Sequence, residues 1–338
     1  MNSSVRIAIL STALAAAACG QDMHSVANMF KPQATPAESV YHLSLLVLAV
    51  CAAIFLVVAG VLAYTIVRFR QRVEDQREPA QVYGSNQIEI AWTVIPILIV
   101  FVLTMATARV VSAVQNKRAS AEALQITVVG HQWWWEIRYP GLGIVTANEL
   151  HVPVSTTTKP KLAFLKLESA DVAHSFWVPQ LAGKTDLIPN RTNSMWIDPK
   201  QEGTFLGNCA EYCGTQHANM LLRVIVESQA EFSKWTAWQR HRAVTDARLE
   251  AGRIQFLSLS CVNCHAVSGT SAAGTFGPDL SHLMSRDTLA AGVIPNSVEN
   301  VRAWIKDPEA IKPGSLMPNM QLTSAELDEV VSYLSSLK

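Results

Sequence analysis

The sequence predicts a multi-domain membrane protein with three successive parts. These are a two-helix transmembrane hairpin, a β-rich domain of the sandwich or Greek-key barrel type, and a small all-α domain. Three observations carry this prediction. Two long apolar stretches lie before residue 112, closely spaced β-type runs occupy about 121–228, and helical patterns with a Pro- and Gly-rich middle fill the rest.

The composition agrees with a chain that is part membrane and part soluble. Of its 338 residues 49% are hydrophobic and 16% charged, whereas an average soluble domain is about 25% charged. The 27 Lys and Arg residues balance the 27 Asp and Glu residues, which argues against nucleic acid as a partner, because binding a polyanion needs a basic excess. Six Cys residues are too few for a disulfide scaffold in so long a chain.

Residues 1–19 have the pattern of a secretory signal. Arg6 gives a positive start, and the apolar run that follows is too short to span a bilayer. The segment ends in Ala-Ala-Ala-Cys-Gly, which resembles a bacterial lipoprotein cleavage site with Cys19 as the lipidated residue. An ordinary cleaved signal with an incidental Cys19 is the alternative.

Residues 20–120 are expected to form an N-terminal segment and the hairpin, with spans at about 41–67 and 88–111. Each span supplies the roughly 20 apolar residues that a bilayer requires. The connecting segment carries four arginines, Arg68, Arg70, Arg72 and Arg77. The positive-inside rule therefore places the 68–87 loop in the cytoplasm and everything after about 112 outside it.

Glu89 lies where the second span begins. A carboxylate at this depth is either solvated among the lipid headgroups or lies at the mouth of a proton path.

The remaining chain is expected to fold as two units joined by a helix. Residues 121–228 contain seven short runs rich in Val, Ile, Thr and aromatic residues, separated by turn residues. Residues 229–250 have a polar helical pattern and are interpreted as a linker helix. Residues 251–338 form the last domain, and its closing amphipathic helix is capped by Thr323 or Ser324.

A first metal constellation follows the last β-type runs. Within 12 residues the chain has two thiols, an imidazole and a thioether, and a further imidazole lies upstream. The residues are Cys209, Cys213, His217, Met220 and His174. Soft sulfur ligands with imidazole and a thioether favour copper over zinc. Two thiolates, where a mononuclear blue copper site has one, predict a dinuclear copper centre; a short structural disulfide is the alternative.

This pattern resembles subunit II of the haem–copper cytochrome c oxidases. The likeness covers about residues 19–228 and includes the hairpin and the run from Gly130 to Trp135, here His-Gln-Trp-Trp-Trp where His-Gln-Trp-Tyr-Trp is more usual. The resemblance implies a cupredoxin-like β-barrel with a binuclear copper A centre.

By that resemblance one copper takes His174, Cys209, Cys213 and Met220. The other takes both Cys residues, His217 and the backbone carbonyl of Glu211. The resemblance further implies a magnesium ion at the Glu211 carboxylate, shared with subunit I. It assigns Trp133 to electron uptake and Glu89 to the mouth of a proton path, and it places Asp171 at the interface or behind a ligand.

A second constellation is Cys261-Val262-Asn263-Cys264-His265, the attachment signature of c-type haem. The thiols would form thioethers and the His would bind iron, with Met317 as the sixth ligand and Met320 as the alternative. Half of a zinc site or a redox dithiol would also use two Cys, but no second Cys pair lies nearby. The domain resembles a small class I cytochrome c, in which the carbonyl of Pro278 would accept a hydrogen bond from the ligand His.

Together these features predict subunit II of a caa3-type oxidase in a bacterial inner or plasma membrane. Its expected partners are oxidase subunit I, subunit III, the lipid bilayer, and a donor such as a quinol–cytochrome c reductase or a soluble cytochrome c. The complete ligand set argues against a quinol oxidase subunit, and covalent haem argues against a copper-delivery protein. An accessory subunit of a nitric oxide reductase would differ only in its partner.

Overall fold

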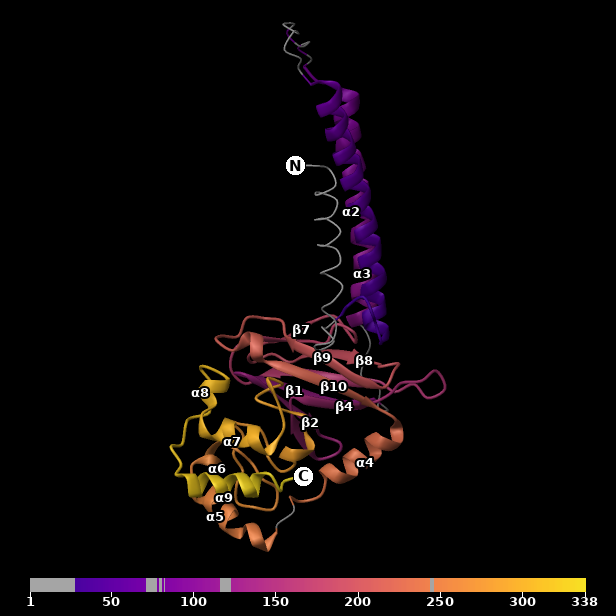
Figure 1. Ribbon diagram of the computed structural model, residues 1–338. Coiled ribbons are helices and arrows are strands. Elements are labelled where there is room, and N and C mark those ends of the chain that lie inside the picture. The colour runs from indigo at the N-terminus through magenta and orange to yellow at the C-terminus, as the bar shows by residue number, and fades with distance from the viewer. Residues whose placement is uncertain (1–27, 71–77, 79–80, 82, 116–122, 244–245) are drawn as a thin grey trace, which may run out of the picture.

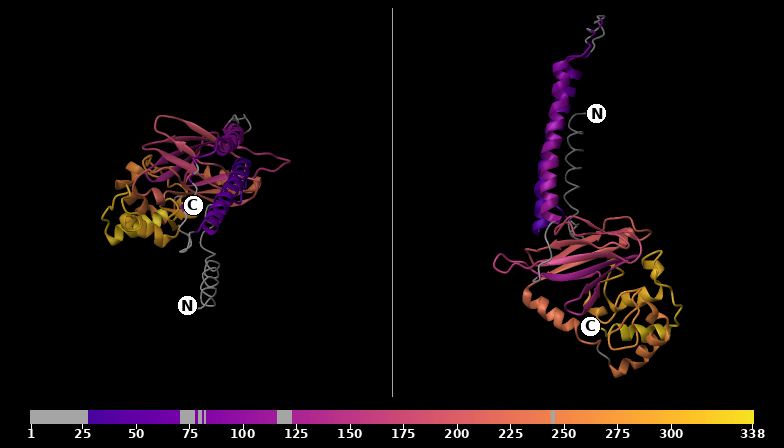
Figure 2. Two further views of the ribbon diagram at one scale, coloured as in Figure 1. Left: turned by 90° about the horizontal axis from the view of Figure 1, so that it is seen from above. Right: turned by 180° about the vertical axis from the view of Figure 1, so that it is seen from behind.

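The computed structural model describes residues 28–70, 78, 81, 83–115, 123–243 and 246–338. A long helical hairpin stands on one side of a β-sandwich, and a helical domain lies on the side away from the hairpin (Figure 1). The view from behind shows the same order of parts (Figure 2). This order confirms the predicted fold class. The expected signal segment 1–19, with Cys19, lies outside the described residues.

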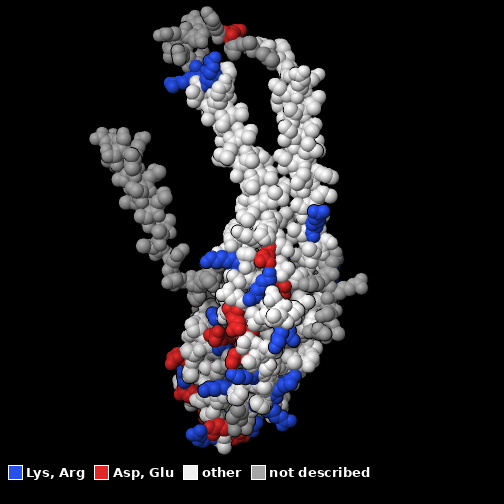
Figure 3. All heavy atoms as spheres, turned by 90° about the vertical axis from the view of Figure 1, so that its right-hand side faces the viewer, with Lys and Arg blue, Asp and Glu red and all other residues white. Residues whose placement is uncertain are grey.

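The hairpin consists of α2 (Thr35–Arg68) and α3 (Asn86–Gln115). Their most apolar windows have mean hydropathies of 3.1 and 2.4, and neither window is buried inside the protein. Figure 3 shows the hairpin free of charge over most of its length, with basic side chains gathered at its tip. These features fit a protein that spans the membrane twice. Both helices extend beyond the predicted apolar spans, because regular hydrogen bonding continues through polar turns such as that at Glu38.

The foot of the hairpin is joined to the sandwich at strand β8 (Asn193–Ile197) and the residue after it. The Thr35 hydroxyl donates to the Asp198 carboxylate over 2.6 Å. The indole nitrogen of Trp196 donates to the carbonyl of Val114, also over 2.6 Å. The two ends of the hairpin are therefore each tied to the same edge of the sandwich.

The sandwich has two five-stranded sheets, ordered β3-β2-β1-β5-β8 and β4-β10-β9-β6-β7. The other strands of the first are β1 (Leu124–His131), β2 (Trp134–Tyr139), β3 (Ile144–Ala147) and β5 (Ala163–Ser169). The second has β4 (Glu149–Pro153), β6 (His174–Trp177), β7 (Thr185–Leu187), β9 (Gly203–Cys209) and β10 (Leu221–Glu227). The seven predicted runs are all strands, and β3, β6 and β7 are additional short ones.

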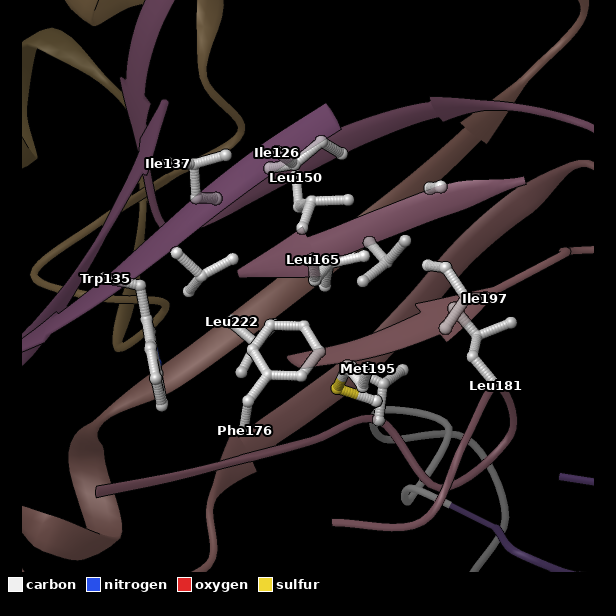
Figure 4. Packing of buried hydrophobic residues seen from close by; sticks show 14 of the residues in the cluster. Ile126, Trp135, Ile137, Leu150, Leu165, Phe176, Leu181, Met195, Ile197 and Leu222 are labelled. Carbon is white, nitrogen blue, oxygen red and sulfur yellow. The ribbon is translucent and has the colours of Figure 1, made fainter. Parts of the chain in front are cut away.

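The core of the sandwich lies between these sheets (Figure 4). Alternate residues of β5, such as Leu165 and Leu167, are fully buried. So are Leu222 and Val224 of β10 in the facing sheet. This alternation is what a strand with one face on the core requires. Trp135 and Phe176 close the core at the end where the candidate metal ligands lie, with their ring centroids 5.8 Å apart.

The expected linker helix over 229–250 is divided in the structure. Helix α4 (Gln229–Gln239) ends well before residue 250, and a short 3-10 turn, η2 (Ala247–Leu249), precedes α5 (Glu250–Ser258). Trp235 of α4 stacks on His151 of β4 with centroids 4.2 Å apart. The first part of the segment therefore packs on the sandwich.

The last domain is helical, with α5, α6 (Cys261–Cys264), α7 (Val298–Lys306), α8 (Pro308–Ile311) and α9 (Ser324–Leu334). Its core is separate from that of the sandwich. Helices α5 and α9 meet so closely that a Cβ on Gly252 would lie 2.1 Å from the carbonyl oxygen of Glu329. Thr323 caps α9 in a capping box with Glu326, which decides between the two predicted caps.

Candidate metal centres

The cluster of sulfur and imidazole groups forms at the end of three adjacent strands. Strand β9 pairs with β6 so that Phe176 lies opposite Cys209, and it pairs with β10 so that Asn208 lies opposite Leu221. His174 begins β6, and Met220 directly precedes β10. Sheet register thus brings His174 to a loop whose residues are 35 or more positions away.

The two thiols face each other without a bond. Their sulfur atoms are 3.8 Å apart, nearly twice the length of a disulfide. Nδ1 of His174 lies 3.9 Å from the Cys209 sulfur, and Nδ1 of His217 lies 3.6 Å from the Cys213 sulfur. The ligand atoms of His174 and both Cys residues lie within 4.8 Å of one another. The short-disulfide alternative does not describe this arrangement.

Two further donors complete the cluster. The Met220 sulfur lies 3.9 Å from the Cys213 sulfur, and the backbone oxygen of Glu211 lies 3.2 Å from the Cys209 sulfur. Hydrogen bonding to the Cys213 thiol lowers the pKa of Cys209 to about 3, which favours a thiolate there. Two sulfurs with one imidazole on each side, a thioether and a carbonyl are the donor set of a paired soft-metal site, so the residues fit copper A.

Asp171 orients the His174 ring. Its carboxylate lies 2.8 Å from Nε2 of His174, which leaves Nδ1 facing the thiols. Burial lowers the pKa of His174, but hydrogen bonds to Asp171 and Cys209 raise it overall. Gly130 allows this close packing, since a Cβ there would lie 2.7 Å from the His174 ring.

Trp133 contacts the copper-ligand loop, defined as residues 210–220 between β9 and β10. Its indole nitrogen donates to the carbonyl of Cys213 over 3.0 Å, and the side chain of Gln132 donates to the same oxygen over 2.7 Å. Gln132 and Trp133 also line a cavity that is otherwise lined mostly by residues of the helical domain. Trp133 therefore contacts the backbone of the first candidate centre and lines the cavity of the second. Trp134 lines the same cavity but is buried, and Trp135 is fully buried in the core of the sandwich.

The cavity, about 290 Å³ in volume, contains the c-type haem motif. Cys261, Cys264 and His265 line it together with Met317 and Met320. Nδ1 of His265 lies 2.7 Å from the carbonyl of Pro278, as predicted. Burial lowers the pKa of His265, so the ring is held neutral, and the remaining nitrogen is the one available to a metal.

Two observations make this cavity suitable for haem. A Cβ on Gly277 would lie 2.6 Å from the His265 ring, so only glycine lets the chain pass so near. Arg286, which the sequence analysis missed, is buried in the lining, and its Nε has no hydrogen-bond partner among the described residues. The carboxylates of a haem would supply such a partner. Met317 also packs against the core of the domain.

The other predicted residues lie apart from these centres. Glu89 is in the first turn of α3, at the end of the hairpin far from the sandwich (Figure 1). The side chain of Glu211 is exposed on the copper-ligand loop, beside the exposed Tyr212. Neither carboxylate contacts another candidate residue through a hydrogen bond of the described residues.

Comparison with known proteins follows the same division of the chain. Residues 23–110 match the transmembrane domain of cytochrome c oxidase subunit II, and residues 146–228 match its periplasmic domain. Residues 249–338 match cytochrome c. Cytochrome c oxidase subunit 2 of Alkalihalophilus pseudofirmus is 34% identical over 314 residues, covering 91% of this chain and 90% of the relative. This chain belongs to the cytochrome c oxidase subunit II family.

A second relative agrees with the assignment. Cytochrome c oxidase subunit 2 of Bacillus subtilis is 34% identical over 341 residues, covering 95% of this chain and 93% of the relative. The solved periplasmic domain of subunit II of the Bradyrhizobium japonicum oxidase is 31% identical, with a TM-score of 0.33 over 35% of this chain and 93% of that one. This oxidase subunit II is thus a component of a haem–copper oxidase, and its two matched families imply copper A and haem c.

Proposed function

We propose that this subunit accepts electrons for a caa3-type cytochrome c oxidase. Electrons from an external donor would pass through haem c and copper A to the haem and copper centres of subunit I, where O2 is reduced to water with proton pumping. When bound, haem c and copper A each supply reversible one-electron storage. The chain itself forms and breaks no substrate bond.

The observation that carries the proposal is the position of Trp133. Its indole contacts the Cys213 carbonyl, and the same residue lines the cavity that holds His265. One side chain thus joins the surroundings of both candidate centres. A chain that delivers copper or stores haem would have no need of this contact.

The residues have distinct proposed roles. His174, Cys209, Cys213, His217, Met220 and the Glu211 carbonyl would hold the copper pair. Cys261 and Cys264 would attach the haem, with His265 and Met317 on the iron. Met317 is preferred over Met320 because it alone of the two packs against the domain core. The two thiolates would hold both copper ions, and His174 and Cys209 would do so from the ends of paired strands, which suits reversible electron transfer.

The remaining assignments concern the rest of the complex. The exposed Glu211 carboxylate would share a magnesium ion with subunit I, and Glu89 would mark the mouth of a proton path. The basic hairpin tip would face the cytoplasm of a bacterial cell, with both metal domains outside the inner or plasma membrane. Subunits I and III and a donor such as a quinol–cytochrome c reductase or a soluble cytochrome c are the expected partners. The proposed units remain 20–120, 121–228 and 251–338.

Photoreduction of haem c in the purified oxidase tests the route. Haem oxidation and copper reduction should then proceed together at a rate independent of protein concentration, because both centres are on one chain. A rate proportional to concentration would show that electrons pass between molecules instead.

A further inference from the structure

Lys312 is a buried lysine at the contact between the helical domain and the sandwich. It follows α8 and is only 4% exposed. Its ammonium group donates to three backbone oxygens, those of Trp133 at 2.8 Å, Asn219 at 2.9 Å and Ala290 at 3.1 Å. Two of these carbonyls belong to the sandwich and one to the helical domain. A single side chain therefore binds both domains at once.

The surroundings of Lys312 are unusual for a lysine. None of the ion pairs among the described residues includes it, and its three hydrogen-bond partners are backbone carbonyls. Burial lowers the pKa of Lys312 to about 7. A buried ammonium is costly unless its hydrogen bonds are made. This side chain is therefore well placed only when the domains adopt the observed arrangement, and it favours that arrangement over others.

The two residues after Lys312 continue the contact. The side chain of Gln216 donates to the carbonyl of Pro313 over 2.5 Å. A Cβ on Gly314 would lie 3.2 Å from Cγ2 of Thr215, and this glycine has a φ of +80°. Residues 312–314 thus lie on residues 215–219, the part of the copper-ligand loop between Cys213 and Met220. The same segment leads, three residues later, to Met317.

We propose that Lys312 is a positioning residue that holds the haem-ligand loop, residues 312–317, against the copper-ligand loop. It thereby sets the rate of electron transfer between the two centres. The proposal rests on the proposed function of the two centres. Lys312 is not itself a proposed ligand; it acts through the backbone carbonyls of Trp133 and Asn219. Asn219 directly precedes Met220, and the Trp133 indole donates to the carbonyl of Cys213.

A second contact keeps the domains together when Lys312 is changed. The buried carboxylate of Glu149 accepts hydrogen bonds from the backbone of Asp287 and Thr288 and from the Thr288 hydroxyl, at 2.9 to 3.1 Å. This contact lies on β4 and does not involve the copper-ligand loop. Loss of Lys312 should therefore loosen the loops locally without separating the domains.

The test compares Lys312→Met with Lys306→Met in the purified oxidase. Lys306, exposed at the end of α7, is the matched control. Internal haem-to-copper transfer is measured after photoreduction of the haem. We expect it to slow about tenfold or more in Lys312→Met, the change that loss of a few charge-assisted hydrogen bonds makes to a docking equilibrium. The spectra of both centres and the control should be unchanged.

Each outcome has a separate meaning. If the wild type transfers electrons internally and Lys312→Met does so at the same rate, the proposed role of Lys312 is overturned and the proposed function stands. Absence of internal transfer in the wild type would overturn the proposed function itself. A second measurement uses only the wild type and varies the viscosity of the solvent. If the two loops stay in contact, the transfer rate should not depend on viscosity. A rate that falls as viscosity rises would show that the domains must move together before transfer, and this would contradict the proposal.

Discussion

A carboxylate oxygen of Asp171 lies 2.8 Å from Nε2 of His174, and this contact turns the other ring nitrogen toward the thiol of Cys209. The pair fixes both the tautomer and the orientation of a proposed copper ligand. The ring is fully buried, whereas the Asp171 side chain is 29% exposed. Among the described side chains, only Asp171 reaches Nε2 through a hydrogen bond.

Replacement of Asp171 by Asn should therefore weaken copper binding. Loss of a carboxylate behind a ligand His lowers metal affinity by about 10- to 100-fold in other metal sites. Copper titration of the variant measures this, with the exposed Glu202→Gln as control. Equal affinities in the two variants would mean that the carboxylate does not orient the ligand.

Met220→Leu should alter the copper centre alone. Its sulfur lies beside Cys213, and Leu keeps the volume but removes the donor. The near-infrared absorption and the redox potential of copper should shift, while the visible spectrum of the haem stays as it was. A variant that lost its haem spectrum would contradict the separation of the two sites.

Met317→Leu and Met320→Leu distinguish the two candidate haem ligands. Both side chains line the cavity, but only Met317 packs against the domain core. We expect Met317→Leu to abolish the sulfur-to-iron charge-transfer absorption of the oxidised haem and to lower its potential. Met320→Leu should retain both properties, and the reverse pattern would exchange the two roles.

Glu149 gives the contact between the domains a dependence on pH. Burial raises its pKa above the ordinary value of 4.5, hydrogen bonds from the backbone of Asp287 oppose this, and the Asp287 carboxylate adds to it. Because the folded state holds the proton more tightly than the unfolded state, the associated stability is present below pH 4.5 and is lost as the pH rises through the raised pKa. Arg286 lies near and partly offsets the charge.

Glu149→Gln should remove this dependence, since an amide does not titrate and its oxygen can still accept from Thr288. The free energy of unfolding of the wild type, measured against that of the variant at several pH values, should decline as the pH rises and then level off. Parallel curves would show that Glu149 has the same pKa in both states.

The sequence was enough to predict candidate ligands where they lie close together in the chain. Cys209 to Met220 and Cys261 to His265 are short motifs, so spacing alone indicated their ligands. His174 was indicated by the cluster of Cys, His and Met residues downstream, although strand pairing is what brings it there. Pro278 needed the family resemblance, because loop packing brings it to His265. The short strand β6 was missed, since its four residues lie inside the motif that drew attention to His174.

The contact between the domains could not be predicted. Lys312 lies 179 residues from Trp133 in the chain, and nothing around it distinguishes it from a surface lysine. From the sequence, Glu149 at the start of β4 would be expected to be exposed. It is buried because the helical domain covers it. Arg286 is recognised only by its burial in the cavity. Such residues follow from tertiary packing, which leaves no periodic pattern in the sequence.

The most direct test of the account is an absorption spectrum of the purified full chain, oxidised and then reduced, from the visible into the near infrared, with metal analysis of the same sample. The account predicts a c-type haem band together with a near-infrared copper band, and two copper ions for each iron. A haem band without the copper band, despite a full supply of copper, would contradict it, because the Cys209 and Cys213 site would then be a disulfide or hold another metal.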